Sequence, residues 1–148
     1  MRVSAEQDQP DFKPLTWLPL VTEHLQGMLQ ASREQLDLLG PALTEPYKLD
    51  DATVDRLKEA FQTQLADLWL WQEQVRQWRE GEHGPLDADQ KAGVAKAGEL
   101  VEQIHTVDER VLAAAEQISK VTIEKLLAKP DMQVGLEALG RAEPGPGR

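Results

Sequence analysis

Residues 51–80, DATVDRLKEAFQTQLADLWLWQEQVRQWRE, carry the pattern that decides the fold. Large side chains recur every seven residues in two rows, which are Val54, Phe61, Leu68, Val75 and Leu57, Gln64, Trp71, Trp78. A seven-residue repeat keeps one seam of a helix against its neighbours, so it predicts packing at a shallow crossing angle. Asp50 or Asp51 is the expected N-cap, and Gly81 follows the end of the helix.

A first helix is expected before this stretch, over residues 16–39. Its apolar residues fall at spacings of three and four and form one stripe, which is Leu18, Val21, Leu25, Met28, Leu29, Ser32, Leu36 and Leu39. Thr16 is the expected N-cap, and Gly40-Pro41 is expected to stop the helix.

A third helix is expected over residues 88–128, because Asp87 and Gln90 form a capping-box pattern and no proline follows until Pro130. Residues 106–109, Thr-Val-Asp-Glu, repeat the capping pattern. A break into two shorter helices near Thr106 is therefore the alternative.

These segments predict an all-α fold, an elongated up-down three-helix bundle with coiled-coil-like packing. A short fourth helix is expected over residues 131–139, within a domain that spans residues 14–139. Residues 1–13 and 140–148 are expected to form a disordered arm and tail, because they lack a periodic apolar pattern.

Composition excludes several classes of function. The 148 residues include no cysteine, so disulfides, thiolate nucleophiles and cysteine-ligated metals are excluded. With 26 acidic and 16 basic residues the net charge is −10, so we expect binding to neither nucleic acid nor anionic membrane surfaces. The first residues lack the apolar core of a signal peptide, and a cytoplasmic location is expected. One alternative remains for the acidity, a decoy that occupies a nucleic-acid-binding protein.

Glu102 and His105 have the Glu-x-x-His spacing that di-metal sites use in helical bundles. Such sites use the motif twice, whereas this chain has it once, and His105 lies at the edge of the apolar stripe. A metal-dependent enzyme or metal carrier that uses Glu102, His105 and His24 is the alternative function. Because no hydrolase, nucleotide-binding or zinc-protease motif occurs, we expect no catalytic residue, no resident metal and no cofactor.

Asp108 falls on the apolar stripe of the third helix, in the row Val94, Val101, Asp108, Ala115. A buried carboxylate without a partner is costly. Two interpretations remain open. Asp108 sets the register of a helix interface, or it caps a broken helix at Thr106 or pairs locally with His105.

The turn Leu68-Trp69-Leu70-Trp71 is apolar on every side. One neighbour cannot cover all its sides. Either two other helices of the chain cover this helix, or the side with Trp69 and Leu70 meets another chain or another protein. The second alternative predicts an interaction surface that includes Trp69, Leu70 and Trp78. The third helix has a second apolar row, and we assign its residues Leu100, Val107 and Val121 to the same surface.

The sequence therefore predicts a non-enzymatic helical bundle that acts through protein–protein interaction in a regulatory, adaptor or structural role. The expected partner is a second copy of the chain, another protein, or both.

Overall fold

The computed structural model describes residues 11–45 and 49–128, and for residues 122–128 the backbone alone. It contains a 3-10 turn and three long helices, which are η1 (Leu15–Trp17), α2 (Leu18–Thr44), α3 (Asp51–Arg79) and α4 (Ala88–Ala128). No strand occurs in these described ranges, and the prediction of an all-helical fold is confirmed. The expected helix over 131–139 and the expected tail lie outside the described residues.

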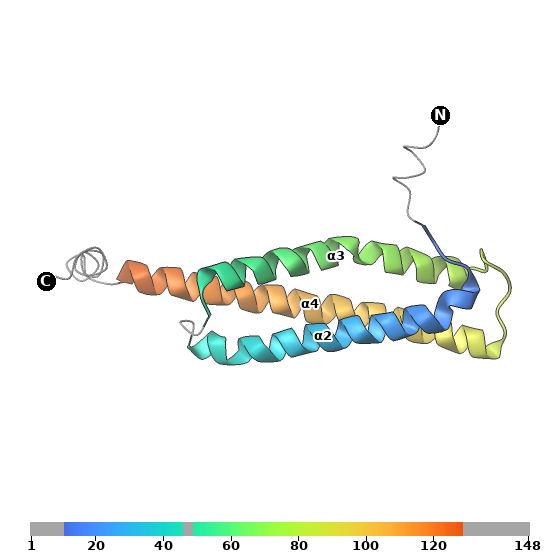
Figure 1. The fold of residues 1–148 in the computed structure, drawn as a ribbon, viewed down its shortest axis with the longest axis horizontal. Helices are drawn as coiled ribbons and strands as arrows, with labels where there is room; N and C mark the ends of the chain where they lie inside the picture. The colour runs from blue at the N-terminus through green and yellow to red at the C-terminus, as the bar shows by residue number, and fades with distance from the viewer. Residues whose placement is uncertain (1–10, 46–48, 129–148) are drawn as a thin grey trace, which may run out of the picture.

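The three helices lie side by side, and successive helices run in opposite directions (Figure 1). Close backbone packing joins α4 to α2 and α4 to α3, with little close approach between α2 and α3 themselves. The C-terminal end of α4 extends beyond both neighbours (Figure 1). The central helix is therefore α4.

This central position overturns one expectation. Leu100 and Val107 were expected to stay uncovered, but they are only 3% and 8% exposed. A helix with neighbours on two sides buries residues of two apolar rows, so Leu100 and Val107 of the second row belong to the core of the single chain. Between them lie Ile104 and Val111, each 0% exposed.

The two ends of α2 differ from the expectation. Thr16 does not cap the helix, because it lies within η1, and α2 begins at Leu18 with Trp17 as a cap residue that makes no side-chain hydrogen bond. Pro41 does not stop the helix either, and α2 continues to Thr44. The last turn is held because Ala42 is buried to 2% exposure and Pro41 O accepts hydrogen bonds from Glu45 N at 3.0 Å and Thr44 Oγ1 at 3.1 Å.

Side-chain caps fix the starts of the other two helices. Thr53 N donates to Asp50 Oδ1 at 2.7 Å at the start of α3. At the start of α4, Gln90 N donates to Asp87 Oδ1 at 2.7 Å and Asp87 N donates to Gln90 Oε1 at 2.9 Å, as a capping box requires. No break occurs at Thr106, since α4 is one continuous helix.

The residues just before η1 pack against the end of α3. Lys13 N donates to Gln74 Oε1 at 2.6 Å, and Lys13 O accepts from Gln74 Nε2 at 3.2 Å and from Trp78 Nε1 at 3.0 Å. Gln74 and Trp78 are 3% and 0% exposed. The expectation of a disordered arm is therefore wrong for Lys13, and residues 1–10 lie outside the described ranges.

Replacing Gln74 tests this attachment. The Gln74→Leu substitution should lower the free energy of unfolding by roughly 1–3 kcal/mol, because Lys13 N loses its buried partner and Lys13 O loses one of two. Urea denaturation measures the change, with Gln62→Leu on the exposed side of α3 as the control. Equal stability of the two variants would contradict the assignment.

Candidate functional site

The strip between α2 and α3 is hollowed at both ends. A cavity of about 670 Å³ is lined by residues that include Trp17, Leu20, Leu70 and Trp71. A second cavity of about 560 Å³ is lined by residues that include Leu38, Leu39, Leu57 and Phe61. We call this strip, with its Trp17 cavity and its Leu38 cavity, the α2–α3 groove.

Two side-chain contacts cross the groove, one in the lining of each cavity. The rings of His24 and Trp71 lie 5.2 Å apart, centroid to centroid. Farther along, Gln64 Nε2 donates to Ser32 Oγ at 3.1 Å. Side chains thus join α2 to α3 where their backbones stay apart.

Exposed apolar side chains gather on the α2 side of the groove. Five large hydrophobic residues of the described chain are exposed, namely Trp17 (41%), Leu20 (57%), Leu38 (66%), Leu43 (40%) and Trp69 (50%). Four of them belong to η1 or α2. Leu20 lines one cavity and Leu38 lines the other.

The residues predicted for an interaction surface do not form one surface. Leu70 is half-buried in the Trp17 cavity, whereas Trp69 lines neither cavity of the groove. Successive helical residues point about 100° apart, so neighbours on α3 face different sides. Trp78 is fully buried beneath Lys13 and cannot contribute, and Val121 near the far end of α4 is partly exposed.

Asp108 lies in a buried polar cluster that links all three helices. It is 0% exposed, and its Oδ2 accepts a hydrogen bond from Gln64 Nε2 at 2.5 Å. The same amide donates to Ser32 Oγ, and Ser32 is 1% exposed. Asp108 Oδ1 has no hydrogen-bond partner in the described part of the chain.

Burial raises the pKa of the Asp108 carboxyl above its ordinary value of 3.8. Hydrogen bonding from Ser32 and Gln64 and the nearby His105 oppose this rise. Burial is the largest of these effects, so the ionised carboxylate is less favourable here than in water. The alternative in which Asp108 pairs locally with His105 is wrong, since His105 Nδ1 lies 3.5 Å from Glu109 Oε1 instead.

Each member of this cluster lies in the apolar stripe of its own helix, and no local pattern in the sequence connects the three. Ser32, Gln64 and Asp108 are the polar interruptions in the stripes of three successive helices. Buried polar side chains need hydrogen-bond partners, so one polar residue in the apolar stripe of each helix predicts that the three lie at one level of the bundle and bond to one another.

The structure does not assemble the metal site considered above. Glu102 is exposed on α4, and His24 lies across the bundle against Trp71 of α3. Within residues 11–45 and 49–128, no group of three or more His, Asp or Glu side chains could hold a metal ion.

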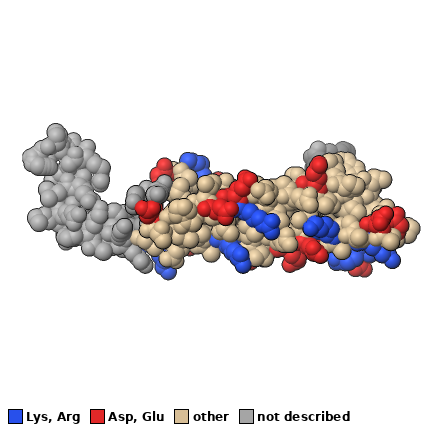
Figure 2. Space-filling model, turned by 90° about the horizontal axis from the view of Figure 1, so that it is seen from below, with Lys and Arg blue, Asp and Glu red and all other residues tan. Residues whose placement is uncertain are grey.

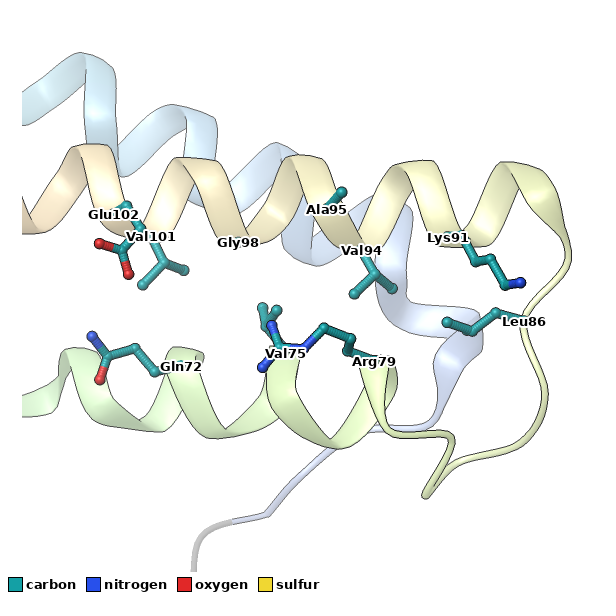
Figure 3. A pocket seen from close by; sticks show the side chains of 10 residues that line it. All are labelled: Gln72, Val75, Arg79, Leu86, Lys91, Val94, Ala95, Gly98, Val101 and Glu102. Carbon is teal, nitrogen blue, oxygen red and sulfur yellow. The ribbon is translucent and has the colours of Figure 1, made fainter.

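A third cavity, of about 580 Å³, lies between α3 and α4 (Figure 3). Arg79 and Lys91 reach toward it from the two helices, and Val75, Val94 and Val101 make an apolar wall. No histidine, serine or pair of carboxylates lines it. Besides Arg79, its ionisable lining residues are Lys91 and Glu102.

Charge on the α2 side of the molecule is mixed. Figure 2 shows this side with acidic and basic side chains interspersed and wide uncharged areas between them. A decoy of nucleic acid needs a continuous acidic surface, and this face does not provide one.

Comparisons with known proteins add no identification, because no protein-family model, curated protein or solved structure matches the chain. Among the described helices, none combines the length and the apolar character needed to cross a membrane.

Replacing Asp108 tests the state of the buried cluster. The pKa of Asp108 is higher in the folded chain than in the unfolded chain. Its contribution to the free energy of unfolding is therefore complete below pH 3.8 and is lost as the pH rises through the raised pKa of the folded chain. Above that window, Asp108→Asn should unfold with a free energy roughly 1–3 kcal/mol higher than the wild type. Urea denaturation across a pH series measures this difference, which should shrink toward low pH. A variant less stable than the wild type at neutral pH would show that the fold stabilises the ionised carboxylate.

Proposed function

We propose that the chain is a non-enzymatic interaction protein, an antiparallel three-helix bundle that pairs with a second copy through the α2–α3 groove. The observation that carries this proposal is the exposure of Leu20 and Leu38, 57% and 66%, beside the two cavities of the groove. A regulatory, adaptor or structural role follows from an activity that consists of binding alone.

In the monomer the exposed side chains of Leu20 and Leu38 contact water, which is unfavourable for apolar surface. A contiguous apolar surface with a polar rim commonly marks a binding site for another protein. A groove between two helices accepts an amphipathic helix, which places apolar residues into hollows spaced along it. The two cavities of the α2–α3 groove are hollows of this kind.

The chain itself supplies a helix of the required form. The exposed side of α2 has large leucines near both ends, at Leu20 and Leu38, and small residues at Gly27 and Ala31 between them. Each copy therefore offers both an apolar ridge and a groove beside it. Two-fold symmetry uses both at once, because the same patch of each copy contacts the other.

The free energy gained by burying Leu20 and Leu38 favours the dimer over the monomer. Burying a fully exposed leucine side chain contributes roughly 1.5–3 kcal/mol. Leu20 and Leu38 start 57% and 66% exposed, so each contributes the corresponding part of that energy, once in each of the two copies. The loss of translational and rotational freedom opposes this gain, so we expect a dimer that forms at micromolar concentrations. Asp67 and Arg56 line the groove and provide polar contacts around the apolar ones.

Leu20→Glu tests the proposed function. The charged side chain would be forced into the contact between copies, whereas in the single chain Leu20 is already exposed, so the variant should be a folded monomer. Sedimentation equilibrium should give about twice 16.6 kDa for the wild type at high micromolar concentration and 16.6 kDa for the variant.

Trp69→Glu is the matched control, because Trp69 is similarly exposed at 50% but lines neither cavity of the groove. It should sediment as a dimer. A wild-type mass of one chain at every concentration would overturn the proposed function. Loss of the dimer in Trp69→Glu alone would move the contact to the other side of α3.

A further inference from the structure

We propose that the second copy lies antiparallel, with its α2 along the α2–α3 groove and with the two-fold axis passing between the two α2 helices level with Leu29. This inference rests on the proposed function and names the segment of the partner that fills the groove.

The exposed side of α2 is symmetric about Leu29. Leu20 and Leu38 are equally far from that residue in the two directions, about 27 Å from each other along the helix at 1.5 Å per residue. That separation is about five helical turns, so both point to the same side. Gly27 and Ala31, equidistant from Leu29 in the same way, lie between them and are exposed.

An antiparallel pair turns this symmetry into contacts. Reversal about the level of Leu29 brings the Leu38 of one copy opposite the Leu20 of the other, at the Trp17 cavity. The same operation brings the second Leu20 to the Leu38 cavity. At the centre Gly27 meets Ala31, and two small residues let the helix backbones approach closely.

Open space at the centre fits this arrangement. A Cβ added at Gly27 would meet no atom within 4 Å, so this side of α2 has room for a second chain. Gly40 is equally open and lies on α2 too, but about 100° per residue places it on a different side of the helix. The two glycines make a matched pair for testing.

Charge separates the antiparallel arrangement from a parallel one. A parallel pair places Glu34 level with Glu34 of the other copy and Glu23 level with Glu23, and like charges repel. The antiparallel pair places Glu34 level with His24. It also places Glu23 level with Gln35, which lines the Leu38 cavity together with Arg56. In the antiparallel pair neither Glu23 nor Glu34 therefore lies level with another acidic residue.

Disulfide trapping tests the orientation, and the natural absence of cysteine makes the experiment clean. We would mix two single-cysteine variants, His24→Cys and Glu34→Cys, allow the copies to exchange, and oxidise. Positions 24 and 34 meet only across an antiparallel pair, so the mixture should give a crosslinked heterodimer. Each variant alone should stay uncrosslinked, because identical positions then lie about 15 Å apart along the axis and a disulfide needs Cα atoms about 4.4–6.8 Å apart.

The opposite result would overturn the inference. Crosslinks within each single variant, with none favoured in the mixture, would indicate a parallel pair. A Gly40→Cys variant serves as the control for random collisions and should not crosslink.

A second measurement is independent of crosslinking. Gly27→Arg should sediment as a folded monomer and Gly40→Arg as a dimer, with circular dichroism to confirm that both are helical. A wild-type dimer that tolerates Gly27→Arg would overturn this inference and leave the proposed function intact. A wild-type monomer would overturn the proposed function itself.

Discussion

The burial of α4 between two helices is the constraint on which the rest of the structure depends. Its two apolar rows pack against α2 on one side and α3 on the other. A helix that serves as the common support holds its neighbours apart, so α2 and α3 meet through side chains such as His24 and Trp71 and not through close backbones. The groove is a consequence of this arrangement, and so is the exposure of the α2 leucines beside it.

The polar cluster of Asp108, Gln64 and Ser32 works against apolar burial at one level of the bundle. Two observations show its cost: Asp108 Oδ1 has no hydrogen-bond partner among residues 11–45 and 49–128, and the pKa of that carboxyl is raised. The hydrogen bonds from Gln64 to Ser32 and Asp108 require the three helices to keep their present register. A shift of one helix by one turn would leave Gln64 and Asp108 facing apolar side chains. The cluster therefore favours the register in which Ser32, Gln64 and Asp108 lie at one level of the bundle.

Much of the fold was predictable from the sequence, because helical periodicity and caps are local properties. The seven-residue rows of α3, the Asp50 cap and the Asp87–Gln90 capping box all depend on residues within a turn or two of each other. The order of packing was not predictable, since two apolar rows on α4 indicate either two neighbours in the chain or one neighbour and a partner. Leu100 and Val107 were assigned to a partner for that reason, and the structure buries them within the chain.

The candidate site was less predictable than the fold. Trp78 was assigned to an interaction surface because the segment that covers it, at Lys13, has no periodic apolar pattern from which its position could be predicted. Trp69 and Leu70 were grouped because they adjoin in sequence, although adjacent helical residues face different directions. Leu20 and Leu38 lie outside the apolar stripe of residues 16–39. The stripe does not show that they form part of a binding surface, because their exposure depends on where α3 lies.

The pairing of two copies through the α2–α3 groove can be tested by measuring how the solvent accessibility of individual side chains changes with protein concentration. A soluble paramagnetic agent broadens the NMR signals of exposed groups, and the methyl groups of Leu20 and Leu38 can be compared with the indole of Trp69 in the same sample. We expect the two leucines to become protected between low and high micromolar protein, whereas Trp69, which is similarly exposed in the single chain, should stay accessible. Leucine signals that remain broadened at every concentration would contradict this pairing.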